Sequence, residues 1–215
     1  MELNYFVHLQ TLLHYTVGLV TILNPIAAAA IMISSSPSDL TKEDTEEISQ
    51  KATLTVMVAS LITIFLGNAI FELFGITPSS VMVIGGIILL LMSIHMVQGK
   101  IPETSHSPEE SKMAMLKENI SIIPIGIPIL FGPGLISTLM IFKAKSVNFI
   151  DVSLLVMAVL ISGSIVYLTL RNAIFLTKVL GVVGLKIMTR IMGLVVGAIA
   201  AQFIVYGIKA LWQPL

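Results

Sequence analysis

Two short proline motifs inside long apolar stretches are the residues best placed to bind a ligand. The first is Asn24-Pro25 and the second is Gly132-Pro133-Gly134. Proline has no N–H and clashes with the carbonyl four residues before it, so each motif predicts the end of one helix and the start of another. Asn is a favoured N-cap, and proline is favoured at the first helical position. Each motif therefore predicts unpaired backbone groups inside a hydrophobic segment.

These backbone groups suggest a definite chemistry. Unpaired N–H groups are expected at residues 26–28 and 134–136, and each helix start behaves like roughly half a positive charge, so two together suit one carboxylate. The helix ends before the prolines expose carbonyls near residues 21–23 and 129–131. Those oxygens suit an ammonium group or a cation. The pattern predicts a site that binds through its backbone.

Polar side chains near the two motifs complete the candidate site. Ser137 and Thr138 follow Pro133 within the first turns, while Asn68 and Asn172 begin matching "NAIF" segments. For the two asparagines, hydrogen bonding between helices is the alternative interpretation. We predict substrate contacts from Thr21, Asn24, Pro25, Ile26, Ala27, Ala28, Asn68, Gly132, Pro133, Gly134, Ser137, Thr138 and Asn172.

The composition says what kind of protein must position these residues. Of the 215 residues, 56% are hydrophobic and 11% are charged, and the mean hydropathy is +0.99, which indicates an integral membrane protein. The 12 basic and 12 acidic residues balance, so nothing suggests nucleic acid as a partner. The absence of Cys excludes disulfides, thiolate metal sites and cysteine nucleophiles.

Charge-free runs locate the membrane segments. They cover residues 3–38, 52–71, 73–99, 119–142, 152–170 and 191–208, and each is near or above the roughly 20 residues that a spanning helix needs. With six crossings, the loops 34–51, 99–118 and 171–190 share one side and carry nine basic residues against three on the other. The positive-inside rule then puts both termini outside the cytoplasm. If the two motifs are instead tips of re-entrant hairpins, only four segments cross. The basic residues then divide eight to four between the two sides of the membrane.

The chain also matches itself at an offset of 108 residues. This offset places "TILNPIAAAAIMI" on "ILFGPGLISTLMI", Gly85 on Gly193 and Gly99 on Gly207. A repeat of three crossings must be inverted in its second copy. We therefore expect an all-α membrane protein with a first repeat at 1–98, a cytoplasmic linker at 99–118 and an inverted second repeat at 119–215, with the first and fourth helices broken at mid-membrane. An ordinary proline kink is the alternative for either motif alone.

Inverted repeats with interruptions at matched positions are typical of secondary transporters. The six runs hold no charged residue, so a substrate with net charge would find no counter-ion, whereas a zwitterion could bind to backbone groups alone. This favours small neutral amino acids moved by alternating access. A channel is the alternative, and the absence of HExxH, GxSxG and paired aspartates argues against an enzyme. No cofactor is expected beyond H⁺ or Na⁺ as a coupling ion.

The sequence resembles the MarC family, which includes the SnatA-type neutral amino acid transporters. The resemblance lies in "NPIAAAA" at 24–30, "FGITPSSVMVIGGIILL" at 74–90, "IIPIGIPILFGPGLIS" at 122–137 and "GLKIMTRIMGLVVGAIAAQFIVYGI" at 184–208. It implies a six-helix inner-membrane protein that transports glycine and alanine with an ion gradient. Many members continue Asn-Pro with Gly, Asn and a second Pro, where this chain has Ala27, Ala28 and Ala30. The resemblance also leaves drug efflux as an alternative, and the "GLVVG" motif leaves a homodimer open.

Overall fold

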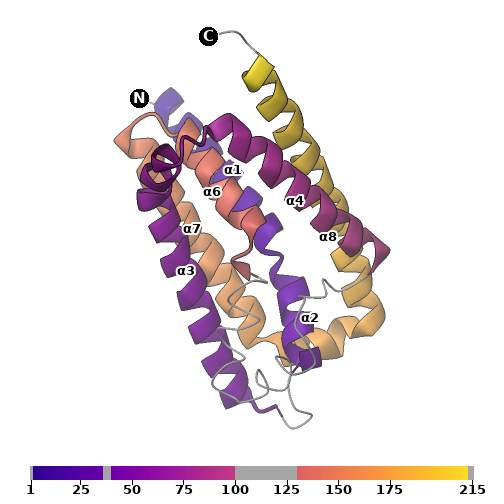
Figure 1. The fold of residues 1–215 in the computed structure, drawn as a ribbon. Coiled ribbons are helices and arrows are strands. Elements are labelled where there is room, and N and C mark those ends of the chain that lie inside the picture. Colours follow the sequence, from indigo (N-terminus) through magenta and orange to yellow (C-terminus); the bar gives the residue numbers. More distant parts are fainter. Residues whose placement is uncertain (1, 36–39, 100–129, 213–215) are drawn as a thin grey trace.

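The computed structural model describes residues 2–35, 40–99 and 130–212, and every regular element in these ranges is a helix. The helices form one elongated bundle (Figure 1). Their bounds are α1 Glu2–Leu23, α2 Pro25–Ser35, α3 Lys42–Leu73, α4 Pro78–Gln98, α6 Pro133–Lys145, α7 Phe149–Arg171 and α8 Ala173–Trp212.

Five stretches of these residues are long and apolar enough to cross a membrane. They are Phe6–Ile33, Lys42–Gly67, Pro78–Gln98, Phe149–Arg171 and Val183–Trp212. The chain is therefore a multi-pass integral membrane protein. The first eleven residues of the predicted span 119–142 and nearly all of the predicted linker 99–118 lie outside the described residues, so the expected sixth crossing stays a prediction.

Helix α3 begins ten residues before the predicted start of its span at residue 52, so the prediction of a loop up to residue 51 is wrong over this stretch. The reason is a capping box: the Thr41 hydroxyl accepts a hydrogen bond from the Asp44 N–H at 3.1 Å, and the Asp44 carboxylate accepts one from the Thr41 N–H at 3.1 Å. Glu43 and Asp44 also lie in the first turn, where acidic side chains stabilise a helix by interacting favourably with its dipole. At 32 residues the helix is about 48 Å long, so it extends beyond the hydrocarbon layer.

The predicted loop 171–190 is also wrong, because α8 starts at Ala173 and includes Lys178, Lys186 and Arg190. Helical geometry is interrupted at Gly181, whose φ of 61° and ψ of 177° lie in a region that essentially only glycine occupies. The segment before Gly181 crosses the lower end of the bundle, and the segment after it runs upward along α4 (Figure 1). The charged residues ended the apolar run in the sequence without ending the helix.

Close contacts at glycines join α4 and α8 into an antiparallel pair. Gly86 of α4 lies against Ile204 of α8, whereas Gly193 of α8 lies against Met96 of α4. Small residues at a helix crossing let two membrane helices approach closely. Gly197 also faces α4, so the "GLVVG" motif is used inside the protein.

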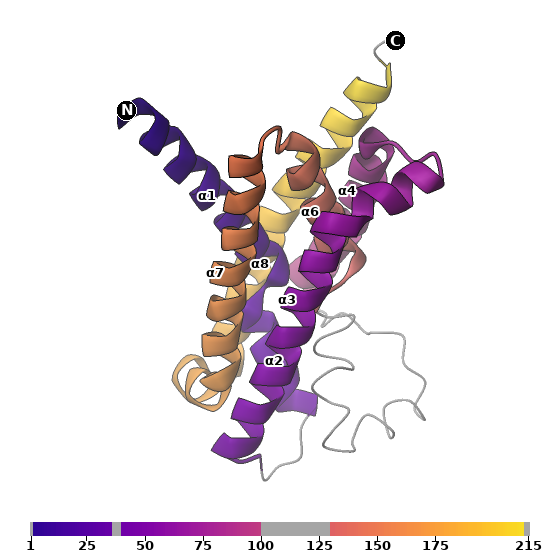
Figure 2. The ribbon, with the colours of Figure 1, turned by 90° about the vertical axis from the view of Figure 1, so that its left-hand side faces the viewer.

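The other helices pack around this pair in a regular way. Helix α3 packs along α7, α2 packs against α7 and α8, and α6 packs against α3 and α4. Helix α1 lies mainly against α7. Figure 2 shows α3 and α7 side by side, with α1 next to α7. The buried core includes Leu19, Met32, Leu89, Leu139 and Leu155, each at most 1% exposed.

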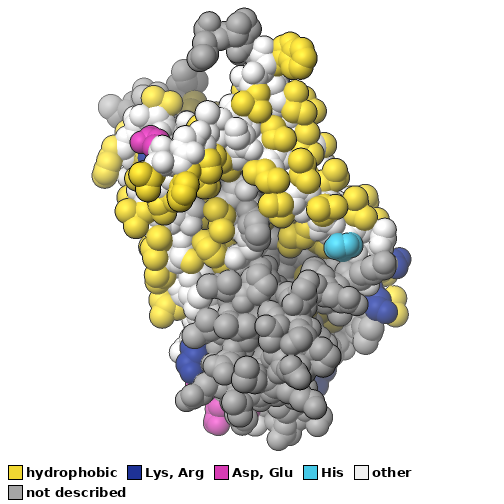
Figure 3. Space-filling view, in the orientation of Figure 1, with side chains coloured by type: hydrophobic (Ala, Val, Ile, Leu, Met, Phe, Trp, Pro, Cys, Tyr) yellow, Lys and Arg dark blue, Asp and Glu magenta, His cyan; other side chains and the backbone are white. Residues whose placement is uncertain are grey.

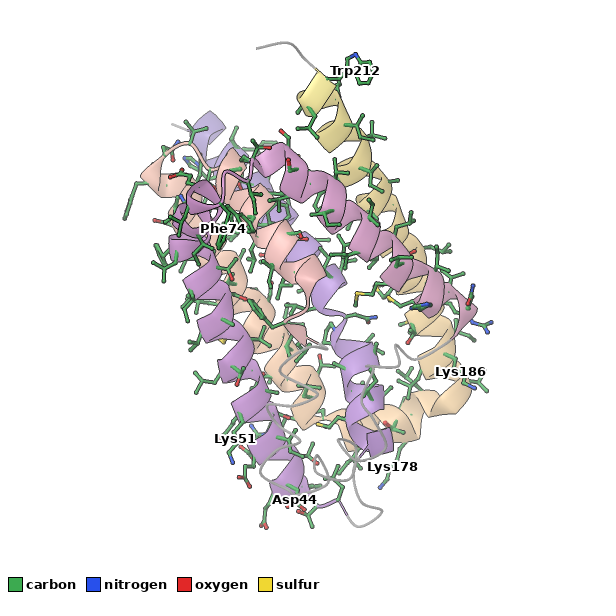
Figure 4. The ribbon with its side chains drawn as sticks, in the orientation of Figure 1. Asp44, Lys51, Phe74, Lys178, Lys186 and Trp212 are labelled. Carbon is green, nitrogen blue, oxygen red and sulfur yellow. The ribbon has the colours of Figure 1, made fainter. Side chains whose placement is uncertain are left out.

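The outer surface and the two ends differ in chemistry. Apolar side chains cover the visible parts of α4 and α8 (Figure 3). Helix α1 begins and α8 ends at one end of the bundle (Figure 1), whereas Lys51, Lys178 and Lys186 lie toward the other end (Figure 4). At this basic end, an Arg171 Nη2 to Glu46 Oε2 contact of 3.2 Å joins α7 to α3.

Candidate functional site

Asn24 separates α1 from α2 with a left-handed backbone conformation. Its φ is +43°, a conformation that Asn tolerates better than most residues. The Asn24 N–H donates to the Val20 carbonyl at 3.0 Å, and the Asn24 carbonyl accepts from the Ala28 N–H at 3.1 Å. The Ala27 N–H reaches the Asn24 side-chain oxygen only at 3.4 Å. Of the first N–H groups of α2, that of Ile26 has no hydrogen-bond acceptor among the described residues.

The same junction leaves carbonyls unpaired at the end of α1. Proline at position 25 offers no donor to the Thr21 carbonyl. Within the described ranges, the carbonyls of residues 21–23 accept no backbone hydrogen bond across the junction. The α1–α2 junction thus presents an N–H donor and carbonyl acceptors within a few residues of each other.

Helix α6 starts in a similar way. Gly132 is its N-cap, Pro133 is its first residue, and no side chain caps the helix. The Leu135 and Ile136 N–H groups both donate to the Gly132 carbonyl, at 3.0 and 3.2 Å. The Gly134 N–H has no acceptor in the part of the chain that the structure describes. Both junctions lie at mid-height in the bundle (Figures 1 and 2).

Most of the predicted site residues are buried around these two junctions. Thr21, Asn24, Ala28, Ser137 and Thr138 are at most 7% exposed. Pro25 and Gly134 are also buried, and Ile26, Ala27 and Gly132 are half-buried. The side chains of Asn68 and Pro133 lie outside the described set, although both residues belong to helices, α3 and α6.

The side chains of the site mainly fasten the junctions to their neighbours. The Thr138 hydroxyl donates to the Gly134 carbonyl at 2.8 Å. Ser137 lies directly against Gly85 of α4. The Asn24 amide nitrogen lies 3.9 Å from the Met96 sulfur, which is a weak contact. The N–H groups of Ile26 and Gly134 and the carbonyls at the end of α1 are the backbone groups that remain for a ligand at the junctions.

Gly134 and Asn172 have structural roles that the sequence did not indicate. A Cβ on Gly134 would lie 2.5 Å from Leu89 Cδ2, so the missing side chain lets α6 pack on α4, and Leu89 lies against this side of Gly134. Asn172 is exposed at the end of α7, and its amide donates to the Leu168 carbonyl at 2.7 Å. In the structure its side chain caps that helix.

A small cavity connects the surroundings of the two junctions. Its wall includes Leu23, the last residue of α1, and Leu135, in the first turn of α6. Ser60 from α3 and Ser162 from α7 supply its polar groups. The cavity has room for about one water molecule. Sequence reasoning missed α3 and α7 here; the available signal was "SGS" at 162–164, a polar interruption of an apolar run.

The site contains no fixed charge. The residues that line the cavity and the junctions are uncharged, and no cluster of metal-binding side chains occurs in the described ranges. The available chemistry is hydrogen bonding from N–H groups to an anionic group and from a cationic group to carbonyls. A ligand carrying both groups and no net charge fits this arrangement.

Comparison with known proteins gives a consistent family. Residues 9–212 match the profile of the MarC family integral membrane proteins. A UPF0056 membrane protein of Methanocaldococcus jannaschii is 34% identical over 97% of this chain and 98% of its own length. A Pyrococcus abyssi relative is 31% identical over 94% of this chain and 96% of its own length. YhcE of Escherichia coli is 29% identical over 94% of this chain and 93% of its own length. No solved structure matches the chain.

Proposed function

Because the chain belongs to the MarC family of integral membrane proteins, we propose that it is a secondary transporter of small neutral amino acids such as glycine and alanine. The single observation that carries the proposal is the pair of helix starts at Pro25 and Pro133, which lie in a part of the bundle lined by uncharged residues. The free N–H groups of Ile26 and Gly134 bind the substrate carboxylate. The carbonyls of residues 21–23 accept hydrogen bonds from its ammonium group.

Charge balance favours a zwitterion over other ligands. Transferring a net charge into a site without a counter-ion is costly, and two helix starts together supply roughly one positive charge. The carboxylate and the ammonium group of an amino acid match the two kinds of backbone group and cancel each other. The cavity has room for about one water molecule, which favours a small substrate over a drug.

The helix packing supports an inverted-repeat architecture with alternating access. Helix α2 contacts α7 and α8, and helix α6 contacts α3 and α4. If α2 corresponds to α6, α3 to α7 and α4 to α8, these two sets of contacts are equivalent. A pseudo-two-fold axis in the membrane plane produces this exchange. We infer that α1 and α2 form one span broken at mid-membrane, that α6 is the second half of an equivalent span, and that the repeats rock around the bound substrate.

The charge distribution suggests how the protein is oriented. We place the end that carries Lys51, Lys178 and Lys186 (Figure 4) in the cytoplasm of the cell, with the protein in the inner membrane and both termini outside. Since the chain has no native Cys, single cysteines report accessibility cleanly. Lys178→Cys should react only with a cytoplasmic reagent and Trp212→Cys only with an external one; reaction of both from one side would overturn this orientation.

Transport itself is tested with purified protein in proteoliposomes. Uptake of radiolabelled glycine and alanine is measured with imposed H⁺ or Na⁺ gradients and with unlabelled amino acid preloaded. A carrier gives saturable uptake that preloading accelerates, and the gradient that drives it identifies the coupling ion. Flux without counterflow would indicate a channel, and absence of both flux and binding would refute amino acid transport.

A further inference from the structure

Ser60 is a buried polar residue on the wall of the cavity between the junctions. It is 2% exposed and lines the cavity. The Ser162 hydroxyl, which also lines the cavity, reaches the Thr16 carbonyl at 3.5 Å. Buried hydroxyls are nearly always hydrogen-bonded. A hydroxyl on the wall of this cavity can therefore form a hydrogen bond with a polar group of an occupant.

The remaining walls say what this occupant is like. Leu19, Leu23 and Leu135 are among the apolar residues that surround Ser60. A mainly apolar wall with few polar groups is typical of a pocket for a short side chain. Since the cavity has room for about one water molecule, it accepts a methyl or hydroxymethyl group and no longer chain.

One contact on the cavity wall sets this limit. Met57 of α3 and Gly163 of α7 both line the cavity, and they pack against each other. A Cβ placed on Gly163 would lie 2.6 Å from the Met57 sulfur and 2.7 Å from its Cγ. A side chain at position 163 would therefore force Met57 to move. Methionine is flexible, so the volume of the cavity depends on where its side chain lies.

We propose that this cavity is the side-chain subsite of the transporter, with the Met57–Gly163 contact setting the length of the side chain it accepts and Ser60 favouring a hydroxyl over a methyl group. The inference rests on the proposed function. Leu23 and Leu135 connect the subsite to the two junctions, because they adjoin Asn24 and Gly134 in the chain. The backbone groups hold the zwitterion, and its side chain enters the cavity.

The test uses two variants that change the cavity in opposite directions. Met57→Ala enlarges it and should raise the ratio of valine to glycine uptake about tenfold. Gly163→Ala pushes Met57 into the cavity and should lower the ratio of alanine to glycine uptake about tenfold. In the double variant the added methyl group has no Met57 to displace, so the alanine ratio should recover.

Further variants test the polarity of the cavity and control for nonspecific effects of substitution. Ser60→Ala should lower the ratio of serine to alanine uptake about fivefold, because it removes one hydrogen bond to the serine hydroxyl. Ile62→Ala is the matched control, since Ile62 lies on the same helix but is 51% exposed. If Met57→Ala fails to fold, Met57→Leu keeps a similar volume with a different shape, and Gly163→Ala still tests the size limit.

The outcomes distinguish the subsite from the proposed function. Opposite changes in size selectivity, with the Ile62→Ala ratios equal to wild type, would support the subsite. If wild type transports glycine and every cavity variant keeps the wild-type ratios, the subsite is refuted and transport stands. If wild type neither binds nor transports any of these amino acids, the proposed function is refuted and the subsite with it.

Discussion

Substitution of Asn24 by Ala and by Gly should separate the backbone role of this residue from its side-chain role. A residue at φ +43° is in the left-handed region, which costs alanine about 1–2 kcal/mol and glycine almost nothing. Asn24→Ala also removes the hydrogen bond from the Ala27 N–H to the Asn24 side-chain oxygen. This bond is long, at 3.4 Å, so we assign its loss about 0.5 kcal/mol, the low end for an N-cap. Asn24→Ala should therefore destabilise the protein by about 1.5–2.5 kcal/mol, and Asn24→Gly by a few tenths.

The assay is thermal unfolding of the purified protein in detergent, followed by circular dichroism. For a chain of this size, Asn24→Ala should lower the midpoint by about 4–8 °C, and Asn24→Gly by about 1 °C. Gln50 is a matched control, because it is an exposed residue inside α3. There the order should reverse, since glycine costs about 1 kcal/mol more than alanine in a helix. If alanine is also better than glycine at position 24, the residue is helical in the membrane and the interruption at Asn24 is refuted.

Three further substitutions test the packing and the helix ends. Gly86→Ala should destabilise the protein by about 1–3 kcal/mol in thermal unfolding, because its Cβ would lie 2.8 Å from a backbone oxygen of α8; an unchanged midpoint would contradict the close α4–α8 crossing. Gly181→Ala should cost about 1–3 kcal/mol from backbone strain alone, since a Cβ there meets nothing within 4 Å; a neutral effect would mean that α8 is not bent at Gly181. Thr41→Ala should cost about 1 kcal/mol and Thr41→Asn much less; equal losses would rule out capping.

The sequence predicted the elements that depend on local signals. Asn24-Pro25 and Gly132-Pro133 mark helix starts in the structure, because the missing N–H and the fixed φ of proline act within one turn. Five of the membrane crossings were predicted from charge-free runs, since a spanning segment must be apolar over most of its length.

Features that depend on distant contacts were not predictable in this way. The bend at Gly181 follows an ordinary helical sequence, and only its φ of 61° reveals it. Gly134 was predicted as a substrate contact, whereas the close approach of Leu89 to the position of its missing side chain appears only in the packing. Ser60 gave no signal, because its relation to the junctions arises from the packing of α3 on α6 and α7. Such pairings bring together residues far apart in the chain, and no local pattern encodes them.

Recognition of a whole zwitterion by backbone groups at the two helix starts is tested most directly by competition against radiolabelled glycine binding to the purified protein. The competitors are glycine, glycinamide, which lacks the carboxylate, and acetate, which lacks the ammonium group. Since a hydrogen bond to a charged group contributes about 1.5–3 kcal/mol, glycinamide and acetate should compete at least about tenfold more weakly than glycine. Glycinamide competing as strongly as glycine would contradict carboxylate binding at the starts of α2 and α6.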